Sequence, residues 1–185
     1  MESNTLIRPR RRSHNLTLLA SLVIAAAARA GTPAQKLMLA GYVDTPAGQA
    51  LLAGEYRSVI QRLGSHGAAY AGDETAGSTN LCVAYIMTRQ WTEAHAACDR
   101  AIASAKADQF EGGLWALQQR DEQVALAYSN RAVLHRLEDD ATGAASDLAM
   151  ARELAPQAQF VSHNVVAFAA SKSASVQSVA VGTQR

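Results

Sequence analysis

Two stretches of this chain share one layout, and this duplication constrains the fold more than any other feature. Residues 80–101 (NLCVAYIMTRQWTEAHAACDRA) and 125–156 (ALAYSNRAVLHRLEDDATGAASDLAMARELAP) each contain an apolar helical half, a short polar break and an alanine-rich second half. They align at an offset of 50 residues, so that Asn80 corresponds to Asn130. A single helix–turn–helix unit cannot cover its own apolar face, so such repeats stack on their neighbours. The sequence therefore predicts an all-α fold of stacked antiparallel hairpins.

Alanines recur at helical spacing in both stretches, where the two helices of each hairpin are expected to cross. Ala94 and Ala101 occupy these positions in the first stretch, and Ala144 and Ala151 occupy them in the second. Such small side chains let helix axes approach near the lower end of the roughly 8–10 Å range. Strand signals are almost absent, since no alternating run of β-branched residues occurs beyond the first thirty residues.

The repeat domain is predicted to span residues 45–170. Its hairpins are expected over residues 45–63, 75–106 and 125–156, followed by a C-terminal capping helix over residues 159–170. Residues 114–137 fit either one long helix or a short extra helix followed by a repeat helix. Residues 31–44 show no clear period and are predicted to be a flexible or loosely docked lead-in. Residues 171–185 are rich in Ser, Val and Ala and are predicted to be a disordered tail.

At these residues the chain resembles the tetratricopeptide repeat family, whose 34-residue unit has small residues at the helix crossing and a proline near its end. The matching positions are Ala132, Ala144, Leu148, Ala151, Leu154 and Pro156 in one copy, and Cys82, Tyr85, Ala94, Cys98 and Ala101 in the other. The second of these copies has Lys106 in place of the final proline, and an insertion within residues 106–124 accounts for the longer offset. The resemblance implies a short α-solenoid that acts by binding other proteins.

The first thirty residues have the three parts of a secretory signal peptide. Four arginines between positions 8 and 12 precede an apolar run over residues 16–28, which is shorter than the roughly 20 residues of a membrane span. Ala28, Arg29 and Ala30 then fit a small-x-small cleavage pattern. We expect residues 1–30 to be a signal peptide cut after Ala30 and the protein to be exported, to the periplasm. An uncleaved N-terminal anchor is the alternative, because Arg29 lies close to the cut.

The charge balance argues against a nucleic-acid partner. The whole chain has a net charge of +1, from 17 basic and 16 acidic side chains, but five of the arginines and one glutamate lie in the predicted leader. The remaining chain has 12 basic and 15 acidic side chains, a net charge of −3. A basic binding surface for nucleic acid is therefore not expected, and no later segment is apolar enough to span a membrane.

Three asparagines hold the same place in three successive predicted helices. Asn80 and Asn130 are related by the repeat offset, and Asn164 lies 34 residues after Asn130. The family resemblance implies that this face lines a concave groove in which an asparagine bonds the backbone of an extended peptide, because an amide offers both donors and an acceptor. The neighbouring turn would add an apolar floor and one charged contact: Val83, Met87, Val133, Leu137 and Arg136.

A structural role for these asparagines is the alternative, since asparagine at this place in such repeats also bonds neighbouring helices. A groove that grips a C-terminal carboxylate needs several lysines or arginines. Only Arg131 and Arg136 lie nearby in this sequence, so that particular activity is not expected.

Cys82 and Cys98 are the only two cysteines and fall on the two helices of one predicted hairpin. An exported chain meets an oxidising compartment, which favours a disulfide between them. Counted from the turn at Arg89 and Gln90, Cys82 is about one helical turn away from directly facing Cys98. Two buried, unbridged thiols are therefore the alternative. Because no CxxC pair occurs, a redox enzyme is not expected.

No set of residues predicts catalysis or metal binding. The chain lacks HExxH, paired CxxC and a glycine-rich phosphate loop, and the acids of the insertion (Asp108, Glu111, Asp121 and Glu122) are expected to be solvated. We therefore expect a non-enzymatic adaptor or scaffold, with no cofactor, that binds a peptide or protein partner through its groove. The first alternative is an assembly subunit that self-associates through apolar helix faces, and the second is an enzyme that uses the insertion within residues 106–124.

Overall fold

The computed structural model describes residues 21–23, 37–64, 74–108 and 113–174, and this part of the chain is mostly helical. The predicted all-α class is confirmed. Most of the predicted leader and insertion residues 109–112 lie outside the described residues, as does the tail from residue 175. In the described part of the chain, no helix is both long and apolar enough to cross a membrane.

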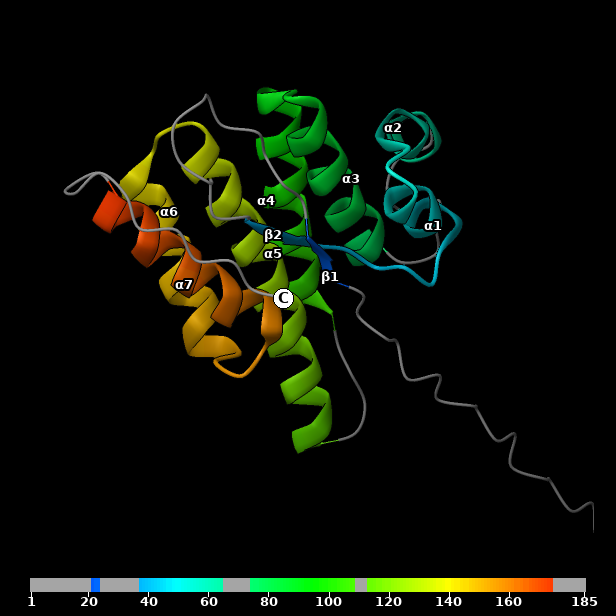
Figure 1. The fold of residues 1–185 in the computed structure, drawn as a ribbon. Helices are drawn as coiled ribbons and strands as arrows, with labels where there is room; N and C mark the ends of the chain where they lie inside the picture. Colours follow the sequence, from blue (N-terminus) through cyan, green and yellow to red (C-terminus); the bar gives the residue numbers. More distant parts are fainter. Residues whose placement is uncertain (1–20, 24–36, 65–73, 109–112, 175–185) are drawn as a thin grey trace, which may run out of the picture.

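Seven helices and two three-residue strands make up the described part (Figure 1). The helices are α1 (Pro46–Leu52), α2 (Tyr56–Gly64), α3 (Glu74–Thr88), α4 (Trp91–Ala107), α5 (Leu114–Leu137), α6 (Ala141–Leu154) and α7 (Gln159–Ala174). The strands are β1 (Ser21–Val23) and β2 (Met38–Ala40), which pair antiparallel.

The two hairpins of the sequence repeat are α3–α4 and α5–α6, and their turns share one backbone feature. Arg89 follows α3 with a φ of 59°, and Asp139 follows α5 with a φ of 62°. These left-handed residues lie 50 positions apart in the sequence, as the aligned stretches do. A single left-handed residue reverses the chain tightly at a helix end. In the second hairpin the Asp140 carboxylate then accepts from Gly143 N–H at 2.9 Å and caps α6.

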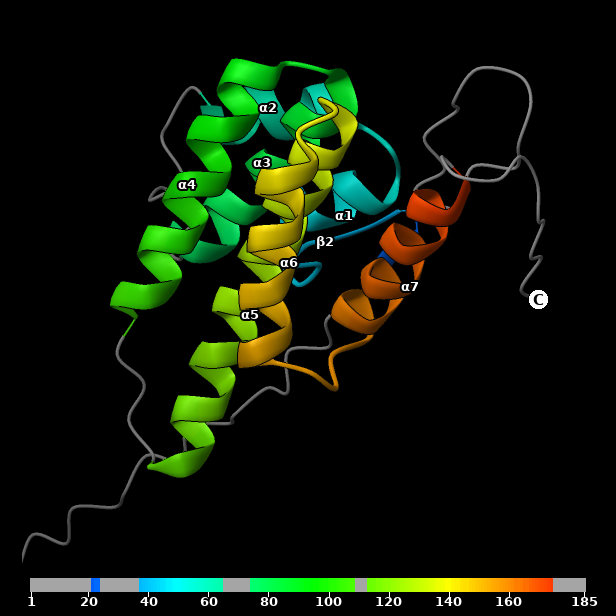
Figure 2. The same ribbon diagram turned by 90° about the vertical axis from the view of Figure 1, so that its left-hand side faces the viewer.

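The helices pack as consecutive layers (Figures 1 and 2). Each hairpin packs its two helices against one another, α4 contacts α5, α2 contacts α3, and α7 contacts both α5 and α6. The alanines at the aligned positions are buried, with Ala94, Ala101 and Ala151 fully inaccessible to solvent. Alanine-rich inner faces therefore form the contacts, as the sequence pattern predicts.

Several element boundaries differ from those predicted. Residues 114–137 form one continuous helix, which settles the alternative that the sequence leaves open. Helix α3 begins at Glu74, close to the predicted start at residue 75. Helix α7 continues to Ala174, so the first residues of the predicted disordered tail are helical.

The prediction that residues 31–44 form a flexible lead-in is wrong for the part that the structure describes. Residues 38–43 are extended and buried, and this stretch is called the inner segment below. Figure 1 shows β2, its first half, crossing α5 between α7 and α3, and β2 contacts both α5 and α7. The stretch shows no helical period because it is a short strand with side chains buried on both faces. A run of this kind is difficult to recognise from sequence periodicity.

Ala151→Leu tests the packing of α5 against α6. Ala151 is fully buried on α6, whereas Ala149 is exposed on the same helix. The larger side chain should overpack the helix contact and lower the free energy of unfolding by about 1–3 kcal/mol. Chemical denaturation measures the change, with Ala149→Leu as the matched control. Equal stability of the two variants would contradict close packing at Ala151.

Candidate peptide-binding face

The three predicted asparagines project from three different helices toward one line. Asn80 lies on α3, Asn130 on α5 and Asn164 on α7, and each is at most 1% exposed. Buried amides must find hydrogen-bond partners, because leaving an amide unpaired costs about 1–3 kcal/mol. Together these side chains are called the asparagine ladder below.

Each asparagine binds the backbone of one residue of the inner segment through two hydrogen bonds. Asn164 Oδ1 accepts from Met38 N–H at 2.8 Å, and its Nδ2 donates to Met38 C=O at 2.8 Å. Asn130 makes the same pair with Ala40, at 3.0 and 2.7 Å. Asn80 makes it with Tyr42, with both distances at 2.9 Å. Six hydrogen bonds thus join the ladder to the segment.

The spacing of these contacts follows from strand geometry. In an extended chain the N–H and C=O groups of every second residue point to the same edge, and the three bound residues are 38, 40 and 42. The segment runs from α7 across α5 to α3, opposite to the order of the helices in the sequence. The ladder therefore replaces a neighbouring strand along one edge of the segment.

Two further contacts hold the end amides of the ladder in place. Asn164 Nδ2 also donates to Ser129 Oγ at 3.0 Å, and Asn80 Nδ2 lies 3.5 Å from Thr45 Oγ1. Thr45 in turn accepts from Gly48 N–H and caps α1. The first contact joins α7 to α5, so the predicted bonding of asparagine to a neighbouring helix is present together with the contact to extended backbone.

The apolar residues predicted around the ladder lie beside the inner segment. Val83 and Val133 are buried in one cluster with Leu39, and Met87 and Leu137 pack against that cluster with partial exposure. Arg136 lies elsewhere, because its guanidinium is 3.9 Å from Asp139 at the turn after α5. Binding of a partner at these residues stays a prediction, because their present occupant is the protein's own chain.

A glycine lies where the inner segment passes beside Asn80. A Cβ atom placed on Gly41 would be 2.7 Å from Asn80 Oδ1, which is too close for a real contact. Gly48 on α1 is more tightly constrained, since its Cβ would overlap the carbonyl oxygen of Tyr42. Sequence reasoning missed both glycines as well as the whole segment. The available signal was an apolar run from Leu37 to Val43 that only Gly41 interrupts.

The opposite edge of the segment faces β1. The register pairs Ser21 with Ala40, Leu22 with Leu39 and Val23 with Met38. All three β1 residues belong to the predicted leader, and the rest of that leader lies outside the described residues. In the chain that retains its leader, β2, the first half of the inner segment, therefore has partners along both of its edges.

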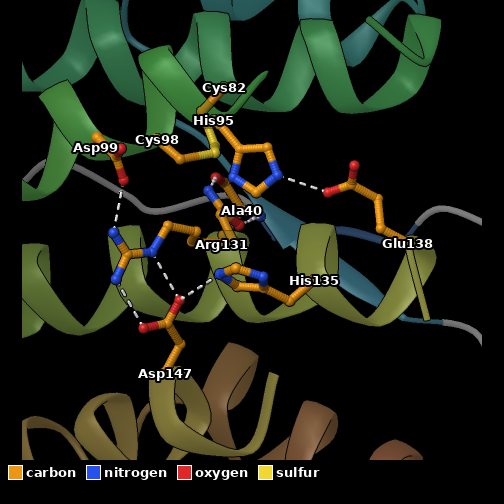
Figure 3. Close-up of a disulfide and its surroundings, with 10 residues drawn as sticks. Ala40, Cys82, His95, Cys98, Asp99, Arg131, His135, Glu138 and Asp147 are labelled. Carbon is orange, nitrogen blue, oxygen red and sulfur yellow. Dashed lines mark hydrogen bonds and ion pairs between the residues drawn. A yellow bond between two sulfur atoms is a disulfide. The ribbon is translucent and has the colours of Figure 1, made fainter. Parts of the chain in front are cut away.

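Ion pairs fix α5 on the side next to Asn130 (Figure 3). Arg131 donates from Nε and Nη2 to the two carboxylate oxygens of Asp147 on α6, at 2.7 and 2.8 Å. Its third contact is to Asp99 on α4, at 2.6 Å. These hydrogen bonds, chiefly those with Asp147, raise the pKa of Arg131 above its ordinary value. Sequence reasoning treated Arg131 as a groove cation and missed this structural role.

Two histidines extend the same network around the hairpin turns (Figure 3). His135 Nδ1 lies 2.8 Å from Asp140, and its Nε2 lies 3.6 Å from Asp147. His95 Nε2 lies 2.6 Å from Glu138. The pKa of Asp140 is lowered, chiefly because its carboxylate accepts from Gly143 N–H. Within the described ranges, His, Cys, Asp and Glu form no group of three or more able to hold a metal ion.

Cys82 on α3 and Cys98 on α4 form a disulfide, so the predicted bridge is confirmed (Figure 3). Their Cα atoms are 4.8 Å apart and neither side chain is exposed. A loop of this length stabilises the fold by about 3 kcal/mol in the chain-entropy account. Since Asn80 is two residues from Cys82, the bridge also holds the α3 end of the ladder.

No family model matches this chain, and neither a curated protein nor a solved structure matches it. The functional interpretation therefore depends on the contacts of the ladder itself.

Gly41→Ala tests the close approach of the inner segment to Asn80. The added methyl group meets Asn80 Oδ1, so we expect the free energy of unfolding to fall by about 1–3 kcal/mol. In an Asn80→Ala background the same substitution should cost less, because the opposing atom is gone. A double-mutant cycle measures this coupling.

Gly64→Ala is the matched control for this cycle, because a Cβ there makes only an ordinary contact, 3.5 Å from Tyr85 Oη. Strictly additive effects of the changes at positions 41 and 80 would contradict the close approach.

Proposed function

We propose that this protein is a non-enzymatic interaction module that binds an extended polypeptide segment on its asparagine ladder. The role is that of an adaptor or scaffold. The repeated hairpins and the resemblance of their residues to tetratricopeptide repeats support a stacked helical scaffold of this kind.

The observation that carries the proposal is the six-bond contact between the ladder and the inner segment. Three helices each contribute one amide, and the amides satisfy alternate residues of an extended chain. Hydrogen bonds to the main chain of the bound peptide supply affinity in strand-addition modes of peptide recognition, and here asparagine side chains provide them. The face is thus built for a polypeptide in extended form, whichever chain supplies it.

The inner segment occupies the ladder until a partner segment replaces it. Because the inner segment is joined to α1 through Asp44 and Thr45 alone, it rebinds at a high effective concentration. A free partner must compete with it. The apparent affinity for the partner therefore equals its intrinsic affinity multiplied by the fraction of molecules whose ladder is open. Exchange then gives the module a closed state and a partner-bound state.

Export to the periplasm is part of the proposal. The predicted leader places the protein outside the cytoplasm, and the disulfide between Cys82 and Cys98 is compatible with an oxidising compartment. A partner would then be a periplasmic protein or peptide with an accessible extended stretch.

A capture experiment tests partner binding, and it must first open the ladder. Each asparagine of the ladder is called a rung below. Substituting a rung in the unmodified chain would weaken the binding of the inner segment and of the partner alike, so the competition between them would be nearly unchanged. Gly41→Val weakens only the occupant, because its side chain meets Asn80. We expect the Gly41→Val protein to retain more partner from periplasmic extract than the unmodified protein. Adding Asn130→Asp should abolish the gain, since a carboxylate cannot donate to the backbone carbonyl.

Asp147→Asn in the same Gly41→Val background is the matched control. It disturbs the ion pair with Arg131 and lowers stability, but Asp147 lies on α6 and both of its carboxylate oxygens bind Arg131, whereas the ladder binds the inner segment from α3, α5 and α7. Capture that persists in this control and disappears with Asn130→Asp supports the ladder as the binding site. Equal capture by all four proteins would contradict the proposed function.

Self-association is the second candidate, and one surface favours it. Leu114, Trp115 and Leu117 at the start of α5 are 86%, 58% and 48% exposed. Exposed apolar residues that gather in one place often mark a protein contact. If the protein is an assembly subunit, Trp115→Ser should convert an oligomer to a monomer in light scattering. A monomer before substitution would favour the binding module instead.

A further inference from the structure

We propose that the asparagine ladder selects its partner by sequence, taking an internal stretch of the type apolar–apolar–Ala–Gly–X, in which X binds Asn80 through its backbone. This inference rests on the proposed function, and it takes the inner segment, residues 38–42 (Met-Leu-Ala-Gly-Tyr), as the pattern for the partner. Backbone hydrogen bonds alone would accept any extended chain. The selection comes from the space that surrounds each side chain.

The ladder sets the register of the occupant. Its amides bind the backbone at residues 38, 40 and 42, so a shift of one residue would turn the bonding groups to the opposite edge. A shift of two residues restores the hydrogen bonds but moves the glycine away from Asn80. Only one placement of the sequence therefore satisfies both the hydrogen bonds and the steric limit at Asn80.

The first three positions of the pattern are enclosed on both faces. Met38 and Ala40 pack in a cluster with Ile102, Phe160 and other residues of α4, α5, α6 and α7. Leu39 packs in the other cluster, with residues of all five helices from α1 to α5. Each of these three side chains is only 2% exposed. A charged residue at any of them would be buried without a counter-charge, which is strongly unfavourable.

The glycine position is the most selective. Asn80 cannot easily move away from an added Cβ, because its amide is already bonded to Tyr42 and lies beside Thr45. Any side chain at this position therefore disturbs the rung that it contacts. The occupant must have glycine there, next to the small alanine bound by Asn130.

The site takes a stretch from within a chain and not a chain end. The occupant continues past the last rung through Asp44 into α1, and Leu37 precedes the first rung. The arginine nearest to the ladder in sequence, Arg131, is paired with Asp147 and Asp99, so it is committed to holding α4, α5 and α6 together. Recognition thus depends on a neutral backbone and apolar side chains.

Fluorescence anisotropy with labelled synthetic peptides tests this selectivity on the full chain. The probe is the eight-residue peptide LMLAGYVD, which copies residues 37–44. Two matched peptides serve as controls: one has valine in place of glycine, and the other has the same residues in scrambled order. We expect the Gly41→Val protein to bind the probe at least tenfold more tightly than the unmodified protein, because its own segment no longer competes well. It should bind both control peptides at least tenfold more weakly than the probe.

The outcomes separate this inference from the proposed function. Equal binding of the probe and both controls, lost on adding Asn130→Asp, would overturn the sequence selectivity while leaving the binding function in place. If Gly41→Val protein with native helicity by circular dichroism binds none of the peptides, the selectivity is overturned. Capture from extract then decides the proposed function separately. If Gly41→Val fails to fold, Gly41→Ala replaces it, since its smaller side chain makes the same contact with Asn80.

Discussion

The hydrogen bonds between three asparagine amides and one buried strand are the interaction on which the rest of this structure depends. A strand buried among helices has no neighbouring strand along the helical side, and its unpaired N–H and C=O groups would each be costly. Side chains that combine donor and acceptor in one group solve this problem. Asn80, Asn130 and Asn164 do so from α3, α5 and α7, and the inner segment connects these helices.

The surrounding helices keep the rungs at the spacing that the strand requires. Buried alanines bring paired helices close together, the Cys82–Cys98 disulfide joins α3 to α4, and Arg131 joins α5 to α4 and α6. The ladder is thus a product of packing between layers, since no single hairpin contains more than one rung. Under the proposed function, a partner that replaces the inner segment would have to fit the spacing that these contacts impose, so the stability of the scaffold and the proposed selectivity would be connected.

Sequence periodicity predicted the helical hairpins and the equivalence of the three asparagines, because these follow from the spacing of the repeat. The bridged cysteines were predicted from the oxidising compartment that the leader implies. Periodicity failed at the inner segment, whose apolar run has no helical or strand period. An apolar stretch without period is compatible with a loop, a strand or part of a helix. Only the contact with the three buried amides of the ladder explains why this stretch is extended. The same limit applies to Arg131, whose partners Asp99 and Asp147 lie on two other helices and are 32 and 16 residues away.

The amino-acid sequence by itself determined the all-α class, the hairpin turns and the equivalence of Asn80 with Asn130, since these depend on local spacing and on a repeat. The tertiary structure alone decided what the ladder holds. Residues 38 and 164 lie 126 positions apart, and they meet only because stacked helices and the buried strand satisfy each other's polar groups. The requirement for glycine at position 41 also arises from the tertiary structure. A side chain at this position would collide with the amide of Asn80, which helix α3 places beside the inner segment.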